Sequence, residues 1–413
     1  MRHRLVSCSL LLMAMFLVVV PTALANTTWY VDGVNGNDNN DCKSPRTACK
    51  TIGHAISLAS SGDSIMVAAA TYTENLAIGF SLKVIGSGAK TTIIDGGGVG
   101  TVVAISATDV VLSKFTIRNG KANYGGGIIN SGMLTINNSI ISGNAATLAG
   151  FRGCSGGGVL NFGTLLINHT TISGNKGIAG GGLCIHGTAT INKSTISGNT
   201  ATAVGSSPAG GGIFSTSAAL TINNSTISGN VTSQYFDHGN GAKGGGIFGS
   251  ATINNSTIVG NTAAGFDGGY GGAIYGSVTV SNSTISWNSA TCCIGGIIGA
   301  TLQDTIVAWN SNGNCGVSVN SNGYNLSSDN TCDFNNTGDL NNTDPKLGSL
   351  GNYGGPTQTI PLLTGSPAID AGNPSGCPDG NGHLLKTDQR GKPRPDKEDS
   401  GGCDMGAYER QKD

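Results

Sequence analysis

The ten residues TINNSTISGN at positions 221–230 recur almost unchanged elsewhere in the chain. Close copies are TINNSIISGN from Thr135, TINKSTISGN from Thr190 and TINNSTIVGN from Thr252. The last asparagine of the motif returns every 22 to 31 residues, at Asn144, Asn175, Asn199, Asn230, Asn261, Asn288 and Asn310. Self-similarity at such a period is typical of a solenoid, in which each repeat forms one coil.

The residue types of the repeat indicate strands. β-Branched Ile and Thr alternate with Asn and Ser, which disfavour helix interiors. A glycine run followed by an aliphatic residue also occurs once per period, as at 271–274, and glycine costs about 1 kcal/mol per residue in a helix. The sequence therefore predicts a parallel β-helix whose coils stack about 4.8 Å apart. The changing period indicates that one turn varies in length, at 145–155 and 231–243.

Three columns of side chains follow from aligning the repeats. Two aliphatic columns are expected to point inward as the core: one contains Ile136, Ile167, Ile191, Ile222, Ile253 and Val280, and the other Ile141, Ile172, Ile196, Ile227, Ile258, Ile285 and Val307. The third column is expected to stack its side-chain amides along the axis: Asn137, Asn168, Asn192, Asn223 and Asn254. Several of these asparagines also lie in glycosylation sequons, but their repetition at one coil position favours stacking.

Composition narrows the class of protein. The chain has 413 residues, 68 glycines and only 11% charged residues, against roughly 25% in typical soluble domains. The regular return of Ile and Val argues against a disordered low-complexity tract. The formal net charge of −1 gives no electrostatic footprint for nucleic acid or for an anionic membrane.

The first 25 residues read as a secretory signal peptide. A basic start is followed by an apolar run from Leu5 to Val20 and by an A-x-A site that ends at Ala25. No later stretch is apolar enough to cross a bilayer. We therefore expect a secreted or extracytoplasmic protein, associated with the cell surface or the outer membrane, with no transmembrane segment after signal removal.

Ten cysteines remain after the signal peptide, and an even number in an exported protein suggests disulfides. The local pairs that we expect are Cys42–Cys49, Cys315–Cys332 and Cys377–Cys403. The sequence leaves the full connectivity open. A cysteine metal site is not expected, because no C-x-x-C motif and no nearby histidine pair accompanies these residues.

The two ends of the chain differ from the repeats. Ile52, Ala55, Ile56 and Ala59 have helical spacing, so we expect a helix that caps the first coil. After Asn310 the pattern stops, and proline, aspartate and arginine become common. We expect an N-terminal cap at 26–64, coils at 65–311, and a small irregular disulfide-bearing module at 312–413 whose Arg390 pairs with a carboxylate.

Three segments resemble known families. The entry region, with Trp29-Tyr30-Val31-Asp32 and Gly62-Asp63-Ser64-Ile65, resembles that of pectin-lyase-like right-handed parallel β-helices. The coils are similar to polymorphic outer-membrane-protein repeats, whose GGAI motif stands at 271–274. The tail resembles the choice-of-anchor Q domain, through Asn352-Tyr353-Gly354-Gly355-Pro356 and Cys403-Asp404-Met405-Gly406 among other segments. The resemblance implies an exported bacterial protein without an assigned activity.

The acidic residues decide between two hypotheses. Polysaccharide lyases and hydrolases of the pectin-lyase-like class need clustered carboxylates, but from 121 to 300 the acids are only Asp237 and Asp267. We therefore favour a non-catalytic structural or adhesive β-helix that binds an extracellular glycan or a surface protein along its polar face, with the enzyme as the alternative. No catalytic or cofactor-binding residue is assigned. The oxygen-rich stretch at 32–41 offers Asp32, Asp38 and Asp41 as candidate calcium ligands, against a plain turn.

Overall fold

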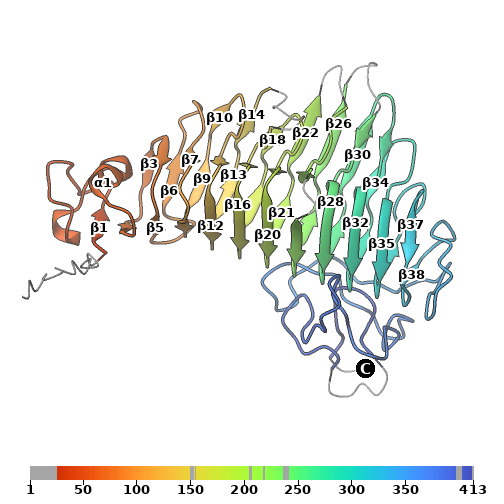
Figure 1. Cartoon of the computed structure of the whole chain (residues 1–413). Coiled ribbons are helices and arrows are strands. Elements are labelled where there is room, and N and C mark those ends of the chain that lie inside the picture. Colours follow the sequence, from red (N-terminus) through yellow and green to blue (C-terminus); the bar gives the residue numbers. More distant parts are fainter. Residues whose placement is uncertain are drawn as a thin grey trace, which may run out of the picture.

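The computed structural model describes residues 26–148, 153, 155–203, 207–216, 219–235, 241–396 and 402–411. The expected signal peptide lies outside these residues. Stacked coils form an elongated rod, and the C-terminal segment folds against one side of its second half (Figure 1). The predicted all-β fold, a parallel β-helix with a cap helix and an irregular C-terminal module, is confirmed.

Two strands of most coils belong to one parallel sheet, sheet A. Its strands pair in register, so that Ile191 lies beside Ile222 and Ile222 beside Ile253, which places the motif copies directly on top of one another. The strands of sheet A are β1 (Thr28–Val31), β2 (Ser64–Val67), β4 (Leu76–Ile78), β5 (Leu82–Gly86), β7 (Val103–Ile105), β8 (Val110–Ser113), β11 (Ile128–Asn130), β12 (Met133–Asn137), β15 (Val159–Asn161), β16 (Thr164–Asn168), β19 (Leu183–Ile185), β20 (Thr188–Asn192), β23 (Ile213–Ser215), β24 (Leu220–Asn223), β28 (Ile247–Asn254), β32 (Ile274–Ser281), β35 (Ile297–Gln303) and β37 (Val319–Ser321).

The other walls of the rod are parallel sheets of shorter strands. Sheet B contains β3 (Thr71–Thr73), β6 (Ile93–Asp95), β9 (Thr116–Arg118), β13 (Ile140–Ser142), β17 (Thr171–Ser173), β21 (Thr195–Ser197), β25 (Thr226–Ser228), β29 (Thr257–Val259), β33 (Thr284–Ser286), β36 (Ile306–Ala308) and β38 (Leu326–Ser327). Sheet C contains β10 (Lys121–Ala122), β14 (Ala145–Ala146), β18 (Lys176–Gly177), β22 (Thr200–Ala203), β26 (Val231–Gln234), β30 (Thr262–Gly265) and β34 (Ser289–Ala290). A small pair, β27 (Ala242–Lys243) and β31 (Gly269–Tyr270), lies in the longer turns.

The interior of the rod is apolar, as the repeat predicts. Side chains alternate between the two faces of each strand, so Ile222 and Ile227 point inward while the residues beside them point outward or into turns. The residues of both expected aliphatic columns are fully buried in one continuous core.

A second set of asparagines, the inner ladder, is buried inside the turns between sheets B and C. It consists of the last asparagine of each motif, and each side-chain amide donates to the side-chain oxygen one coil further on, as from Asn199 to Asn230 at 2.9 Å. The same amide also donates to the carbonyl oxygen of Ile172. Buried polar groups need such partners, so this ladder provides hydrogen-bond partners for the polar groups buried inside the turn.

The predicted outer ladder lies at the turn between sheets A and B. Its side-chain amides donate toward the preceding coil, whereas those of the inner ladder donate toward the following coil. The amide of Asn254 donates to Asn223, which donates to Asn192, and the series continues to Asn137. The N–H of Gly380, in the C-terminal module, donates to the side-chain oxygen of Asn254. Because that oxygen faces Gly380, the nitrogen of Asn254 must face the preceding coil.

The N-terminal end of the rod is closed as expected. Helix α1 (Ile52–Leu58) lies against the first coil and buries Ile52, Ala55 and Ile56, while the hydroxyl of Thr51 accepts the N–H of His54 as an N-cap. A short 3-10 helix, η1 (Pro45–Thr47), precedes it. The indole of Trp29 donates to the buried Asp63.

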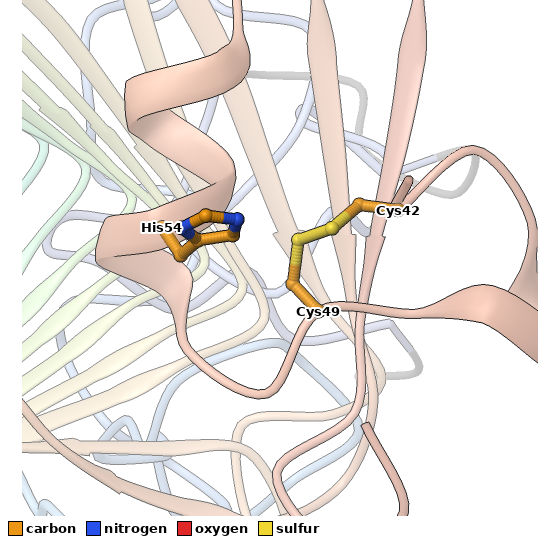
Figure 2. Close-up of side chains that lie close together, drawn as sticks. All are labelled: Cys42, Cys49 and His54. Carbon is orange, nitrogen blue, oxygen red and sulfur yellow. A yellow bond between two sulfur atoms is a disulfide. The ribbon is translucent and has the colours of Figure 1, made fainter. Parts of the chain in front are cut away.

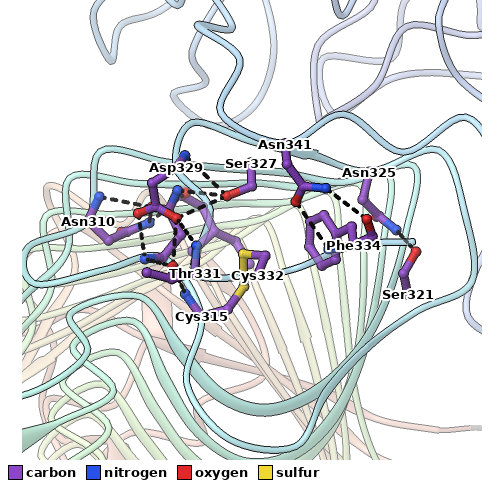
Figure 3. Close-up of a disulfide and its surroundings, with 12 residues drawn as sticks. Asn310, Cys315, Ser321, Asn325, Ser327, Asp329, Thr331, Cys332, Phe334 and Asn341 are labelled. Atoms are coloured by element: carbon purple, nitrogen blue, oxygen red, sulfur yellow. Dashed lines mark hydrogen bonds between the residues drawn. A yellow bond between two sulfur atoms is a disulfide. The ribbon is translucent and has the colours of Figure 1, made fainter. Parts of the chain in front are cut away.

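Strand pairing continues past residue 311, where we expected the coils to end. Strands β37 and β38 pair with β35 and β36, and the disulfide Cys315–Cys332 ties this last coil together (Figure 3). The inner ladder ends nearby, where Asn310 donates to Asn314 and Asn314 donates to two serine hydroxyls. Phe334 is buried against the core at this end.

The C-terminal module covers the outer face of sheet B in the later coils. Its Leu347, Ile360, Leu362, Ala368 and Met405 pack against Val259, Ile306, Ala308 and Leu326 of the coils. Arg390 pairs with Asp388 at 2.7 Å, as predicted for a carboxylate partner, and lies over the ring of Tyr408. The fully buried Arg394 pairs with Glu409 at 2.7 Å and donates to Asn255 of the coils.

The helices of the described residues are short. None of them has both the length and the apolar character that crossing a bilayer requires.

Candidate functional site

Aromatic side chains form a column on the outer face of sheet A. Phe214 of β23 lies in register with Phe248 of β28, and Phe248 with Tyr275 of β32. The ring centroids are 5.1 Å and 5.7 Å apart, with planes within 19° of parallel. The ammonium group of Lys243 lies 5.3 Å from the centroid of the Tyr275 ring. The column is therefore an ordered aromatic stack that begins at the buried Phe214 and ends at the partly exposed Tyr275.

The backbone beside Tyr275 bends because of glycine. In β32 and β35 the pairing register shifts between Tyr275 and Val278, which is a β-bulge. Gly276 and Gly299 stand at this bend in successive coils, and a β-carbon on Gly299 would collide with the carbonyl oxygen of Gly276. Glycine at this position lets the backbones of the two coils approach closely.

A groove of about 500 Å³ opens at this bend. That volume falls within the roughly 300–1,000 Å³ of typical ligand sites. Its lining combines the ring of Tyr275, exposed Val317 and neutral polar side chains, which are Ser277, Thr279, Thr301, Ser318 and Asn320. None of the lining residues carries a formal charge. The groove therefore offers one aromatic wall and several hydroxyl and amide groups, which can hydrogen-bond to a neutral polyhydroxyl ligand.

A second groove of about 470 Å³ runs along the outer asparagine ladder and is bounded by the C-terminal module. His169 and Lys193 line it from the coils, and Asp379 and Leu385 line it from the module. It contains one carboxylate, which the N–H groups of Asn381 and His383 already bind. The arrangement lacks the paired acids of a glycosidase.

In the part of the chain that the structure describes, carboxylates come together in the C-terminal module, where Asp388, Asp404 and Glu409 are held by arginines and backbone N–H groups. The one group of three histidine, cysteine or acidic side chains with adjacent ligand atoms is Cys42, Cys49 and His54. Asp95 forms a surface pair with Arg118 at 2.8 Å. No acid lines the Tyr275 groove and one acid, Asp379, lines the second groove, so neither lining holds the two carboxylates of a glycosidase.

The group at the N-terminal cap is not a metal site in its present state. Cys42 and Cys49 are joined in a disulfide beside His54 (Figure 2). A metal binds the thiolate of cysteine, and a disulfide sulfur offers none. The structure also joins Cys315 to Cys332 and Cys377 to Cys403, which are the other two expected pairs, whereas Cys292 and Cys293 are free thiols.

The candidate calcium ligands Asp32, Asp38 and Asp41 lie in turns before α1, and each carboxylate already accepts hydrogen bonds. The N–H groups of Asn35 and Val34 lower the pKa of Asp32. The hydroxyl of Thr47 lowers the pKa of Asp41. These bonds account for the turn without an ion, and calcium binding stays a prediction that is tested by the melting temperature with and without a chelator.

Sequence reasoning missed the groove, although a signal was present. The residue after the aliphatic position of each glycine motif changes from Leu160 and Cys184 to Phe214, Phe248 and Tyr275 along the rod. Because that position alternates with a buried one, it faces outward. A rise of aromatic residues in an outward column was therefore readable from the alignment of the repeats.

Comparison with known proteins supports the fold. No protein-family model and no curated protein matches the sequence. Among solved structures, pectate lyase Pel9A is similar over 94% of this chain and 98% of its own, with a TM-score of 0.56 and 14% identity. The complex of XylC with xylose is similar over 93% of this chain and 98% of its own, with a TM-score of 0.48 and 10% identity. A rhamnogalacturonan lyase is similar over 83% of this chain and 96% of its own, with a TM-score of 0.39 and 12% identity. The likeness to Pel9A shows that this chain adopts the right-handed parallel β-helix of pectate-lyase-like structures.

Proposed function

We propose that this protein is a non-catalytic β-helix that binds a glycan in the groove beside Tyr275. The observation that carries the proposal is the junction of an ordered aromatic column with a groove of neutral hydroxyl and amide groups. Aromatic rings and a few placed polar groups are the usual composition of small-ligand sites. Similarity to a pectate lyase gives circumstantial support, because that protein acts on a polysaccharide.

The enzyme alternative, a polysaccharide lyase or glycoside hydrolase of the pectin-lyase-like class, has less support. It needs carboxylates within reach of the substrate, and no carboxylate lines the Tyr275 groove, although the ammonium group of Lys243 lies 5.3 Å from the centroid of the Tyr275 ring. Its remaining support is the fold, and fold does not fix activity.

Export belongs to the same proposal. The predicted signal peptide, the disulfides Cys42–Cys49, Cys315–Cys332 and Cys377–Cys403, and the resemblance of coils and tail to surface-protein repeats and a choice-of-anchor Q domain all favour a secreted or surface-associated protein. A surface protein that binds the polar face is the second candidate partner. No residue of the groove favours it over a glycan.

The test uses the mature chain, residues 26–413, and native affinity electrophoresis in gels that contain neutral or acidic polysaccharides. We expect retardation in at least one polysaccharide gel, and loss of that retardation in Tyr275→Ala. Tyr275→Phe, which keeps the ring stacked on Phe248, should retain most of it. Tyr235→Ala is the matched control, because Tyr235 is an exposed tyrosine that does not line the groove.

Two outcomes would count against the proposal. Equal retardation of Tyr275→Ala and the unchanged protein, with equal melting temperatures, would place binding elsewhere. Release of new reducing ends or unsaturated oligosaccharides during incubation would establish the enzyme alternative.

A further inference from the structure

The turn between sheets B and C has the same residue in five coils. Gly143, Gly174, Gly198, Gly229 and Gly260 adopt φ between +61° and +64°, and a β-carbon on any of them would meet no atom within 4 Å. The last two such turns hold tryptophan instead. Val259 pairs with Ser286 and Ser286 with Ala308, so the next residues, Gly260, Trp287 and Trp309, stand in one column.

Both tryptophans keep the left-handed backbone, at φ of 53° and 54°. This conformation costs stability for any L-residue with a side chain, and a bulky residue there is a true outlier. Burial in the core does not offset this loss of stability, because Trp287 and Trp309 are 40% and 37% exposed. The chain's third tryptophan, Trp29, is buried at the opposite end. Strained residues of this kind gather at ligand sites.

The two indoles form a small surface together. Their centroids are 5.1 Å apart and their planes are inclined by 31°, so Trp309 covers one side of Trp287. Trp287 is 40% exposed, and a β-carbon on Gly260, its counterpart in the preceding coil, would meet no atom within 4 Å. The hydroxyls of Thr262 and Ser289, 2.9 Å apart, stand two residues further along the same coils, on the same outward side.

We propose that Trp287 and Trp309 form a second glycan site, which binds a neutral pyranose ring stacked on the open face of Trp287. The face of an aromatic ring carries negative charge, and it attracts the polarised C–H groups on the face of a sugar. Thr262 and Ser289 supply hydroxyl partners at the edge. An anionic ligand would call for arginine or lysine, and the residues that flank the indoles in these coils, Ser286, Ser289, Ala308 and Ser311, are neutral.

This site is independent of the Tyr275 groove, because the groove opens on sheet A and the indoles stand between sheets B and C. It does not rest on the function proposed above. Each site can therefore fail without the other.

The test is a titration of tryptophan fluorescence in the mature chain with cellohexaose, xylohexaose and, as an acidic probe, hexagalacturonate. We expect a saturable change in emission with at least one neutral hexasaccharide and none with the acidic one. Trp287→Gly and Trp309→Gly together restore the residue of the other coils. This variant should lose the response and bind at least tenfold more weakly by calorimetry, yet melt at a higher temperature.

The rise in melting temperature separates a ligand site from a packing role. A double variant that melts lower and binds the hexasaccharide unchanged would overturn the proposal, as would a response confined to hexagalacturonate or no response to any of the three. Tyr275→Ala should leave the fluorescence response intact, and its loss there would also refute a separate site.

Discussion

The side-chain amide of Asn199 donates to the side-chain oxygen of Asn230, 2.9 Å away in the next coil, and both residues are fully buried. Asn199 also accepts from the backbone and side-chain nitrogens of Asn175. One side chain therefore links three successive coils.

Replacing Asn199 by alanine should destabilise the rod strongly. The substitution leaves the backbone N–H of Asn175 and one of its side-chain N–H groups buried without an acceptor, and each such group costs about 1–3 kcal/mol. We expect a loss of more than about 3 kcal/mol in the free energy of unfolding, measured by denaturant titration. Asn192→Ala, in the half-exposed outer ladder, is the matched control and should cost about 1 kcal/mol. Equal losses would contradict the distinction between the ladders.

The contact between the C-terminal module and the coils should become less stable as pH rises. Burial raises the pKa of Asp304 from 3.8 to about 7, against the opposing effects of the Asn373 N–H and Arg394. Between those values the unfolded chain has lost a proton that the folded protein retains, so stability falls with rising pH. Each pKa unit corresponds to about 1.4 kcal/mol as an upper bound.

Asp304→Asn should flatten this dependence. The substitution suits the backbone, because Asn282 holds the equivalent turn one coil earlier at the same φ of 49°. We expect the melting temperature of the variant to fall less than that of the unchanged protein between about pH 4 and pH 7. Identical slopes in both proteins would show that Asp304 does not titrate as proposed.

Gly299→Ala should disrupt the groove. Its β-carbon would collide with the carbonyl oxygen of Gly276, whereas a β-carbon on Gly260 meets open space. Both glycines have positive φ, so the backbone strain of about 1–2 kcal/mol is common to both variants. We expect Gly299→Ala to be the less stable by at least about 1 kcal/mol in chemical denaturation, and glycan retardation to weaken with it. Similar stabilities would mean that the coils part easily at this bend.

Two arginines should differ in their contribution to stability. Arg394 is fully buried between Glu409, Asn255 and the carbonyl of Gly406, and removing one partner of such a pair costs about 3–5 kcal/mol. Arg118 pairs with Asp95 but its side chain is 45% exposed, so its loss should cost less than about 1 kcal/mol. Thermal unfolding of Arg394→Ala and Arg118→Ala compares them directly. A larger effect for Arg118→Ala would refute this view of the module interface.

The architecture was predictable because every repeat has the same pattern of inward and outward residues, so the pattern can be read many times. One isoleucine is ambiguous between helix and strand, but a column such as Ile136, Ile191 and Ile222 is not. The outer asparagine ladder followed from the same alignment, and the cap helix followed from the helical spacing of Ile52, Ala55 and Ile56.

The inner ladder and both candidate sites were harder to predict. Asn230 follows a glycine, so it reads as an ordinary turn residue, and only the three-dimensional path of the turn shows that it points inward. Tyr275 lines a groove only because the neighbouring coils bend at Gly276 and Gly299. The exchange of glycine for Trp287 and Trp309 was visible in the alignment, but its significance lies in the exposure of both indoles.

The opposite directions of the two asparagine ladders have an electrostatic consequence. Amide dipoles aligned head to tail would add with every coil and leave partial charges at the two ends of the rod, as peptide dipoles do in a helix. Here the inner series points from Asn144 toward Asn310, and the outer one from Asn254 toward Asn137. Their axial fields oppose each other, so additional coils would lengthen the rod without building up a dipole. The single N–H of Gly380 that orients Asn254 sets the polarity of the whole outer series.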